Sequence, residues 1–341
     1  MSANATTTNN LSKSPVRIVL FSVMEVSIKE AMKVFAKRED VELALVITCP
    51  GPKSRRSDAY MDVIQALYDE GHHNVDVMVS NKKSKYKEIL KMYEIDMIMS
   101  IGYPWLLPEE ILNPNSPQYK ETSPRLGAVN FHNAMLPQYK GPNSFGWSVI
   151  NEDNAFGFCT HRMDNDFDTG RILLEWSMPD KDINKTHDEI LPELLLKGVD
   201  ATIDMMISED PGQKQTGQGS YAPKFEESFR WVDPATSTAR EIHNRVRAFY
   251  GARDIPLGAL TKINGKVMCL QRTFYREMSP ERDGNYNTDE TENIVSKAKN
   301  GPSSSFFIQC KDTTLEVLEW NFPVNCNNFD IPQNEVTCAA A

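Results

Sequence analysis

Three polar residues carry side chains of the kinds that stabilise charge and move protons. Asn130 and His132 lie two positions apart at the carboxyl end of a short predicted strand, so both side chains project to the same side. Asp168 follows within an Asp-Phe-Asp-Thr-Gly segment. An amide can donate to a developing oxyanion, and imidazole and carboxylate groups exchange protons. Each residue alone is more typical of a turn or a surface position, so only the combination indicates catalysis.

The chain around these residues alternates between short apolar runs and amphipathic stretches. Strands are predicted at residues 16–22, 41–48, 75–79, 95–101 and 128–131, with helices at 27–38, 58–68 and 85–93. This alternation predicts a Rossmann-like, mostly parallel sheet with helices on both faces, in which binding crevices lie beyond the carboxyl ends of the strands. Segments 157–163 and 172–176 predict two more strands. Thr186 and Glu189 form a capping-box pattern before a long helix that reaches about residue 207.

The composition changes at a Gly- and Gln-rich stretch, residues 211–220. A helix is predicted beyond it at 236–250, followed by short strands at 259–261, 266–275, 305–309 and 314–319 that favour a small OB-like β-barrel. We therefore expect five regions: a disordered tail at 1–14, a catalytic domain at 15–209, a linker at 210–230, an OB-like domain at 231–323 and a second tail at 324–341.

Bulk composition excludes several classes of function. No apolar run approaches the roughly 20 residues of a membrane span, and the N-terminal segment lacks the features of a signal or transit peptide, so we expect a cytoplasmic protein, as a monomer. The six cysteines form no CxxC pair, which predicts reduced thiols and no metal site. No GxGxxG follows the first strand, which argues against a nicotinamide dehydrogenase. The formal charge of −10 excludes nucleic-acid binding through bulk charge.

The motifs around the candidate residues resemble those of the folate-dependent formyltransferases, most closely the methionyl-tRNA formyltransferase branch. Asn-Phe-His at 130–132 is followed by LPQYKG at 136–141 and by Asp-Thr-Gly at 168–170. Similar stretches are SIGYPWLLPEEIL at 100–112, SYAPK at 220–224 and EIHNRVRAF at 241–249. The resemblance spans roughly residues 16–320, in the family's order, and implies the formyltransferase fold.

The resemblance implies a reaction in which a formyl group passes from 10-formyltetrahydrofolate to an amine. Asn130 is then expected to donate to the tetrahedral oxyanion. His132 is expected to donate to the same oxygen, best as an imidazolium favoured by Asp168, and Asp168 to take the amine proton. His161 is interpreted as structural. Seven residues are implied to contact folate: Tyr103, Leu106, Leu136, Pro137, Phe167, Thr169 and Gly170.

The sequence favours methionyl-tRNA as the acceptor but leaves its identity open. A basic loop at 51–57 stands where the family contacts the acceptor stem, through phosphate contacts that would come from Lys53, Arg55 and Arg56. Three features depart from the family's pattern. GPNSFG at 141–146 replaces the usual GAAPIQ, and YGARDIPLGA at 250–259 replaces the usual NPWPGA. Segment 231–323 holds 12 basic and 12 acidic residues, so that counterion release would contribute little there.

The main alternative acceptor is a small amine, such as an amino group on a nucleotide-linked sugar. Its pocket would need aromatic stacking and phosphate donors, for which the candidates are Phe145, Trp147 and Arg162. Hydrolysis of formyltetrahydrofolate and a non-catalytic folate- or RNA-binding function are further alternatives.

Overall fold

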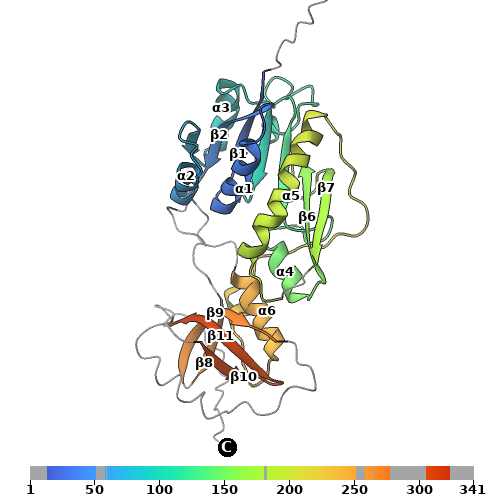
Figure 1. The fold of residues 1–341 in the computed structure, drawn as a ribbon. Helices are drawn as coiled ribbons and strands as arrows, with labels where there is room; N and C mark the ends of the chain where they lie inside the picture. The colour runs from blue at the N-terminus through green and yellow to red at the C-terminus, as the bar shows by residue number, and fades with distance from the viewer. Residues whose placement is uncertain are drawn as a thin grey trace, which may run out of the picture.

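The structure is a computed structural model of the chain. It describes residues 14–50, 58, 60–179, 183–250, 258–263, 265–276 and 305–322, and Figure 1 shows their arrangement. The basic loop at 51–57, the second tail and all but one residue of the first tail lie outside the described residues.

A seven-stranded sheet forms the larger part of the molecule. Its strands stand in the order β3-β2-β1-β4-β5-β6-β7. The first five pair in parallel, whereas β6 is antiparallel to both of its neighbours. The predicted mostly parallel sheet is therefore confirmed. In chain order the strands are β1 (Val16–Phe21), β2 (Val41–Thr48), β3 (Asp76–Val79), β4 (Met97–Ile101), β5 (Ala128–His132), β6 (Ala155–Arg162) and β7 (Ile172–Pro179).

Helices cover both faces of this sheet, because its central strands are apolar on both sides. In β1, Ile18 and Leu20 join one hydrophobic core, whereas Val19 and Phe21 join the other. Helices α1 and α5 lie side by side over the first core, and α3 covers the second (Figure 1). The helices are α1 (Glu25–Phe35), α2 (Tyr60–Asp69), α3 (Tyr86–Met92), α4 (Ser144–Ile150) and α5 (His187–Ile207), with short 3-10 turns at η1 (Lys83–Lys85) and η2 (Glu109–Ile111).

Helices α5 and α4 show where sequence patterns predict a helix correctly and where they do not. The capping box at the start of α5 is confirmed: the backbone N–H of Thr186 donates to Oε2 of Glu189 at 2.8 Å. Helix α4 lies in a stretch for which the sequence pattern predicts no helix. It is seven residues long and contains Gly146, where a Cβ would meet the ring of Phe225. Tight packing, which no local pattern reports, therefore requires glycine there.

The C-terminal part is a second, four-stranded antiparallel sheet in the order β10-β11-β9-β8. It is curled into a half barrel, consistent with the expected OB-like domain, and α6 packs against both β9 and α4 (Figure 1). The elements are η3 (Glu227–Arg230), α6 (Ala239–Tyr250), β8 (Ala259–Ile263), β9 (Lys266–Phe274), β10 (Phe306–Gln309) and β11 (Thr314–Asn321). Among the described helices, none has the length and apolar character needed to cross a membrane.

Candidate functional site

Four polar side chains meet where β5 and β6 run beside each other. Asn130 on β5 stands directly opposite His161 on β6, and cross-strand partners project to the same face. The amide nitrogen of Asn130 lies 3.1 Å from Nε2 of His161. Oδ1 of Asp168 lies 3.5 Å from that same nitrogen and 3.5 Å from Nδ1 of His132. The structure therefore brings the three candidate catalytic residues together and adds His161 to them.

The loop that carries Asp168 is held in an uncommon conformation. Asp168 has φ +58°, in the left-handed region that most residues avoid. Its Oδ2 accepts the backbone N–H of Gly141 at 2.8 Å. The side-chain NH₂ of Gln215 donates to the carbonyl oxygens of Asp168 at 2.9 Å and Gly170 at 2.8 Å. At Gly170 a Cβ would overlap the carbonyl oxygen of Arg162, so the turn can close on β6 only with glycine there.

Backbone carbonyls fix the proton positions on both imidazole rings. His132 donates from Nε2 to the carbonyl of Tyr139 at 2.9 Å, and His161 donates from Nδ1 to the carbonyl of Arg162 at 3.0 Å. Each ring therefore presents its second nitrogen to the same carboxylate oxygen of Asp168. Nε2 of His161 accepts from the amide of Asn130, so one exchangeable proton between Oδ1 of Asp168 and Nδ1 of His132 would satisfy the remaining pair.

Burial decides the charge of the cluster. Burial lowers the pKa of His132 and outweighs the charge of Asp168, which raises it. Burial opposes ionisation of Asp168, but the neighbouring His161 and His132 together bring the pKa of that carboxyl below its ordinary value. Burial therefore works against the imidazolium form of His132 that the resemblance implies. Nor is the Nε2–H of His132 free for an oxyanion, because Tyr139 accepts it.

The residues proposed to contact folate divide into exposed and buried groups. Phe167 and Thr169 are exposed, whereas Tyr103, Leu106 and Pro137 are half-buried. Leu136 is buried in a small cluster with Cys159 and Ile172, and Gly170 is buried in its turn. The hydroxyl of Tyr103 is hydrogen-bonded to that of Tyr86 at 2.8 Å. Leu136 and Gly170 are therefore buried and offer a ligand little surface.

Exposed apolar side chains follow the carboxyl ends of β4 and β5 and precede Asp168. Trp105 comes after β4, Met135 after β5, and Phe167 stands one residue before Asp168; they are 39%, 44% and 52% exposed. Large apolar side chains exposed around a few convergent polar groups are typical of a binding site for a planar organic ligand.

The residues proposed to contact the acceptor are only partly placed toward a ligand. Phe145 is 8% exposed and packs against Phe156 and His187, so it belongs to the core and offers no surface to an acceptor. The guanidinium of Arg162 donates to the carbonyls of Asp210 and Leu126, which makes it a structural brace. Trp147 is half-buried. The basic residues Lys53, Arg55 and Arg56 lie outside the described residues.

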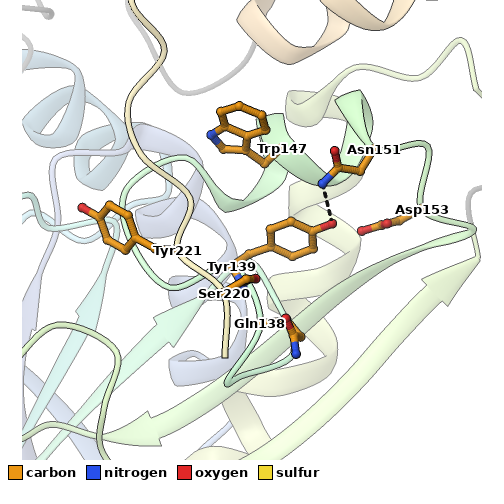
Figure 2. A pocket seen from close by; sticks show the side chains of 7 residues that line it. All are labelled: Gln138, Tyr139, Trp147, Asn151, Asp153, Ser220 and Tyr221. Carbon is orange, nitrogen blue, oxygen red and sulfur yellow. Dashed lines mark hydrogen bonds between the residues drawn. The ribbon is translucent and has the colours of Figure 1, made fainter. Parts of the chain in front are cut away.

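A cavity of about 520 Å³ lies beside the loop that precedes Gly141. Trp147 lines it from α4, and Tyr221 lines it from the segment that leads to the C-terminal sheet (Figure 2). The cavity does not include the polar cluster itself. The remaining lining residues are Gln138, Tyr139, Asn151, Asp153 and Ser220.

Sequence patterns missed two residues of the site. His161 was interpreted as structural, because only the pairing register of β5 with β6 brings it opposite Asn130. No sequence signal points to Gln215, because it reaches Asp168 from 47 positions away in a segment without periodicity. Its Oε1 is buried and has no hydrogen-bond partner. Within the described part of the chain, no group of His, Cys, Asp and Glu is arranged to hold a metal ion.

Known proteins resemble this chain in sequence and in fold. Methionyl-tRNA formyltransferase of Clostridioides difficile is 28% identical over 273 residues, 78% of this chain and 83% of that protein. GDP-perosamine N-formyltransferase of Brucella melitensis is 33% identical over 179 residues, 51% of this chain and 64% of that protein. The fold is also similar to the solved structure of the N-formyltransferase of Helicobacter canadensis, in complex with folinic acid and dTDP-3-aminofucose. The TM-score is 0.54 at 17% sequence identity, and the match covers 90% of this chain and 100% of that protein.

The family model described as formyl transferase matches residues 16–204, which include β1, the four-residue cluster and most of α5. This match covers more than half of the chain and confirms the family resemblance found in the motifs. The chain belongs to the formyl transferase family.

Proposed function

We propose that this enzyme transfers the formyl group of 10-formyltetrahydrofolate to a primary amine at the cluster of Asn130, His132, His161 and Asp168. The observation that carries the proposal is the position of Asp168. A buried carboxylate faces two imidazoles, and a neutral amide donor stands beside them. This arrangement suits a reaction in which a nitrogen loses a proton while a carbonyl oxygen gains negative charge.

The proposed reaction begins with attack of the amine nitrogen on the formyl carbon. A new C–N bond forms and the formyl oxygen becomes an oxyanion, to which Asn130 donates its second amide hydrogen. Asp168 takes the proton that the amine loses, and Nδ1 of His132, 3.5 Å from Oδ1, shares that proton. The bond from the formyl carbon to the folate nitrogen then breaks, and the proton passes to that nitrogen.

Exposed apolar side chains near the strand ends support formyl-folate as the co-substrate. The pterin ring of a folate is planar and polar at its edge, and the apolar side chains of Trp105, Met135 and Phe167 offer faces against which it can lie. Folinic acid in the related Helicobacter canadensis structure supports this choice of co-substrate.

We propose methionyl-tRNA as the acceptor. The methionyl-tRNA formyltransferase of Clostridioides difficile matches this chain over 78% of its length, which extends the likeness beyond the catalytic part. In the test, purified protein receives 10-formyltetrahydrofolate and either methionyl-tRNA or a nucleotide-linked amino sugar, and formylated product is measured by mass spectrometry. Formylation of the sugar alone would refute this choice.

The amino group of a nucleotide-linked sugar is the second candidate. The GDP-perosamine N-formyltransferase of Brucella melitensis shares 33% identity, a higher value over a shorter stretch, and the Helicobacter canadensis structure holds an amino-sugar nucleotide. The basic loop distinguishes the two candidates. If the acceptor is tRNA, changing its three basic residues to alanine raises KM for tRNA and flattens its salt dependence, whereas a sugar acceptor predicts no such change. These residues are Lys53, Arg55 and Arg56.

A further inference from the structure

Residues 213–225 form a strap that runs from the edge of the large sheet past the catalytic cluster. At one end, Gln213 pairs with Ile172 of β7 through two backbone hydrogen bonds, of 2.7 and 2.8 Å. Near the other end, the carbonyl of Pro223 accepts from the indole nitrogen of Trp147 at 2.8 Å. The strap is therefore anchored to β7 and to α4, and the backbone between these anchors can hold a neighbouring loop in place.

The strap pairs with the loop at 138–141 through three hydrogen bonds. The backbone N–H of Tyr139 donates to Oγ of Ser220 at 2.8 Å, and the two residues lie side by side (Figure 2). The N–H of Lys140 donates to the carbonyl of Ser220 at 2.9 Å. The N–H of Ala222 donates in turn to the carbonyl of Lys140 at 2.6 Å. The strap therefore fixes the loop backbone on both sides of the Tyr139 carbonyl.

Close packing adds to these hydrogen bonds. A Cβ on Gly219 of the strap would meet the carbonyl oxygen of Pro137 in the loop. A Cβ on Gly141 of the loop would meet the ring of Tyr221 in the strap. Each segment therefore has a glycine where the other crosses it, and a side chain at Gly219 would push the two apart.

The strap holds Tyr139 in an uncommon conformation that aims its carbonyl at the catalytic cluster. Tyr139 has φ +54°, in the left-handed region that residues other than glycine rarely adopt. Its carbonyl and the N–H of Lys140 belong to one peptide plane, in which the two groups point in opposite directions. Because Ser220 accepts that N–H on one side, the carbonyl is directed to the other side, where His132 donates to it.

The single proton of a neutral His132 ring has two competing acceptors. The carbonyl of Tyr139 accepts it from Nε2 at 2.9 Å. Oδ1 of Asp168 lies 3.5 Å from the other ring nitrogen, Nδ1. A charged acceptor forms a stronger hydrogen bond than a neutral one, so the proton would move to Nδ1 if the Tyr139 carbonyl turned away. The position of that carbonyl therefore decides which ring nitrogen is protonated.

We propose that Ser220 is a positioning residue, which acts through the Tyr139 carbonyl to hold the proton of His132 on Nε2 and to leave Nδ1 open toward Asp168. The inference rests on the proposed function and makes it more specific. An open Nδ1 beside Oδ1 can share the proton that the amine loses. A proton already on Nδ1 would donate to that oxygen before the reaction and make Asp168 a weaker base.

NMR of the histidine rings tests this inference without formyl transfer. In the full chain labelled with ¹⁵N-histidine, long-range ¹H–¹⁵N spectra distinguish protonated from unprotonated ring nitrogens, and His132→Gln identifies the His132 signals. At about pH 8, where an ordinary imidazole is neutral, the wild-type protein should carry this proton on Nε2. Ser220→Ala should shift the ratio of the two forms toward Nδ1–H by about two- to tenfold, as expected for loss of one hydrogen bond.

Gly219→Val is a second, independent way to loosen the strap. Its side chain would collide with Pro137, so it should shift the His132 proton in the same direction without removing the Ser220 hydroxyl. Ser220 is exposed, so Ser220→Ala should leave the urea unfolding midpoint nearly unchanged. Its kcat for formyl transfer should fall by about two- to tenfold while KM for 10-formyltetrahydrofolate stays the same.

Two matched variants make the test specific. Ser220→Thr keeps a hydroxyl acceptor for the Tyr139 N–H and should restore both the proton position and kcat. Thr216→Ala removes an exposed hydroxyl from the same strap and should change neither. A His132 proton that stays on Nε2 in both Ser220→Ala and Gly219→Val, or an equal effect of Thr216→Ala, would overturn the inference.

The two readouts separate this inference from the proposed function. If the wild-type protein formylates an amine but the His132 proton does not move in the strap variants, the positioning role of Ser220 fails alone. If the proton moves as described but the wild-type protein formylates no amine, the positioning role stands and the proposed reaction fails.

Discussion

Gln215 should control turnover although it touches no reacting atom. Its side-chain NH₂ is the donor to the carbonyls of Asp168 and Gly170, and Asp168 stands at φ +58°. For a residue other than glycine this conformation costs about 1–2 kcal/mol relative to the right-handed region. The replacement Gln215→Met keeps the length of the side chain and removes both donated hydrogen bonds.

The magnitude follows from these two hydrogen bonds. Each contributes about 0.5–1.5 kcal/mol net, so the turn loses about 1–3 kcal/mol of stabilisation. A shift of about 1.4 kcal/mol in the conformational preference of the Asp168 turn changes the equilibrium between its two conformations about tenfold. We therefore expect kcat to fall about tenfold or more. Global stability should change less than this, because Met also removes the buried Oε1 of Gln215 that has no partner.

Steady-state formyl transfer and chemical unfolding, measured on the same variants, test this reasoning. The matched control is Gln218→Met in the same segment, because Gln218 uses only its backbone carbonyl, which accepts from Gln138. The control should keep wild-type kcat. Normal kcat in Gln215→Met, or an equal loss in both variants, would refute the claim that Gln215 positions Asp168.

Three other perturbations probe the site and its frame. Asn130→Ala should lower kcat at least about a hundredfold, as expected for loss of an oxyanion donor, and single-turnover kinetics measure it. Burial lowers the pKa of His132 below its unfolded-state value of about 6.5, so the unfolded state binds more protons than the folded state. The free energy of unfolding should therefore decrease as the pH falls below that value. Urea titrations of His132→Gln should show a weaker decrease. Gly170→Ala should lower the free energy of unfolding by about 1–3 kcal/mol or more, because the added Cβ would overlap the carbonyl oxygen of Arg162. Its control is Gly217→Ala, at φ +90° but with open space around it, which should cost only about 1 kcal/mol in the same urea titrations.

Local patterns were sufficient for the architecture of the sheet. Its strands are short apolar runs that bury both faces, as the division of Ile18 and Val19 between two cores illustrates. The position of Asn130 and His132 at a strand end followed from the same patterns. The family motifs then identified Asp168, whose distance of 38 positions from Asn130 carries no structural signal of its own.

Features set by tertiary contacts were missed. The partnership of His161 with Asn130 depends on the antiparallel register of β5 and β6. The charge of His132 depends on how deeply it is buried, which sequence spacing does not report. Phe145 is a candidate for aromatic stacking from the sequence, yet it lies in α4 and packs into the core against Phe156.

Formyl transfer itself tests the central claim most directly. Purified wild-type protein and the Asp168→Asn variant are incubated with 10-formyltetrahydrofolate and methionyl-tRNA, and both tetrahydrofolate and formylmethionyl-tRNA are quantified. Wild-type protein should release the two products in equal amounts, and the variant should do so at least about a hundredfold more slowly. Equal rates in the two proteins would contradict the assignment of Asp168 as the group that takes the amine proton.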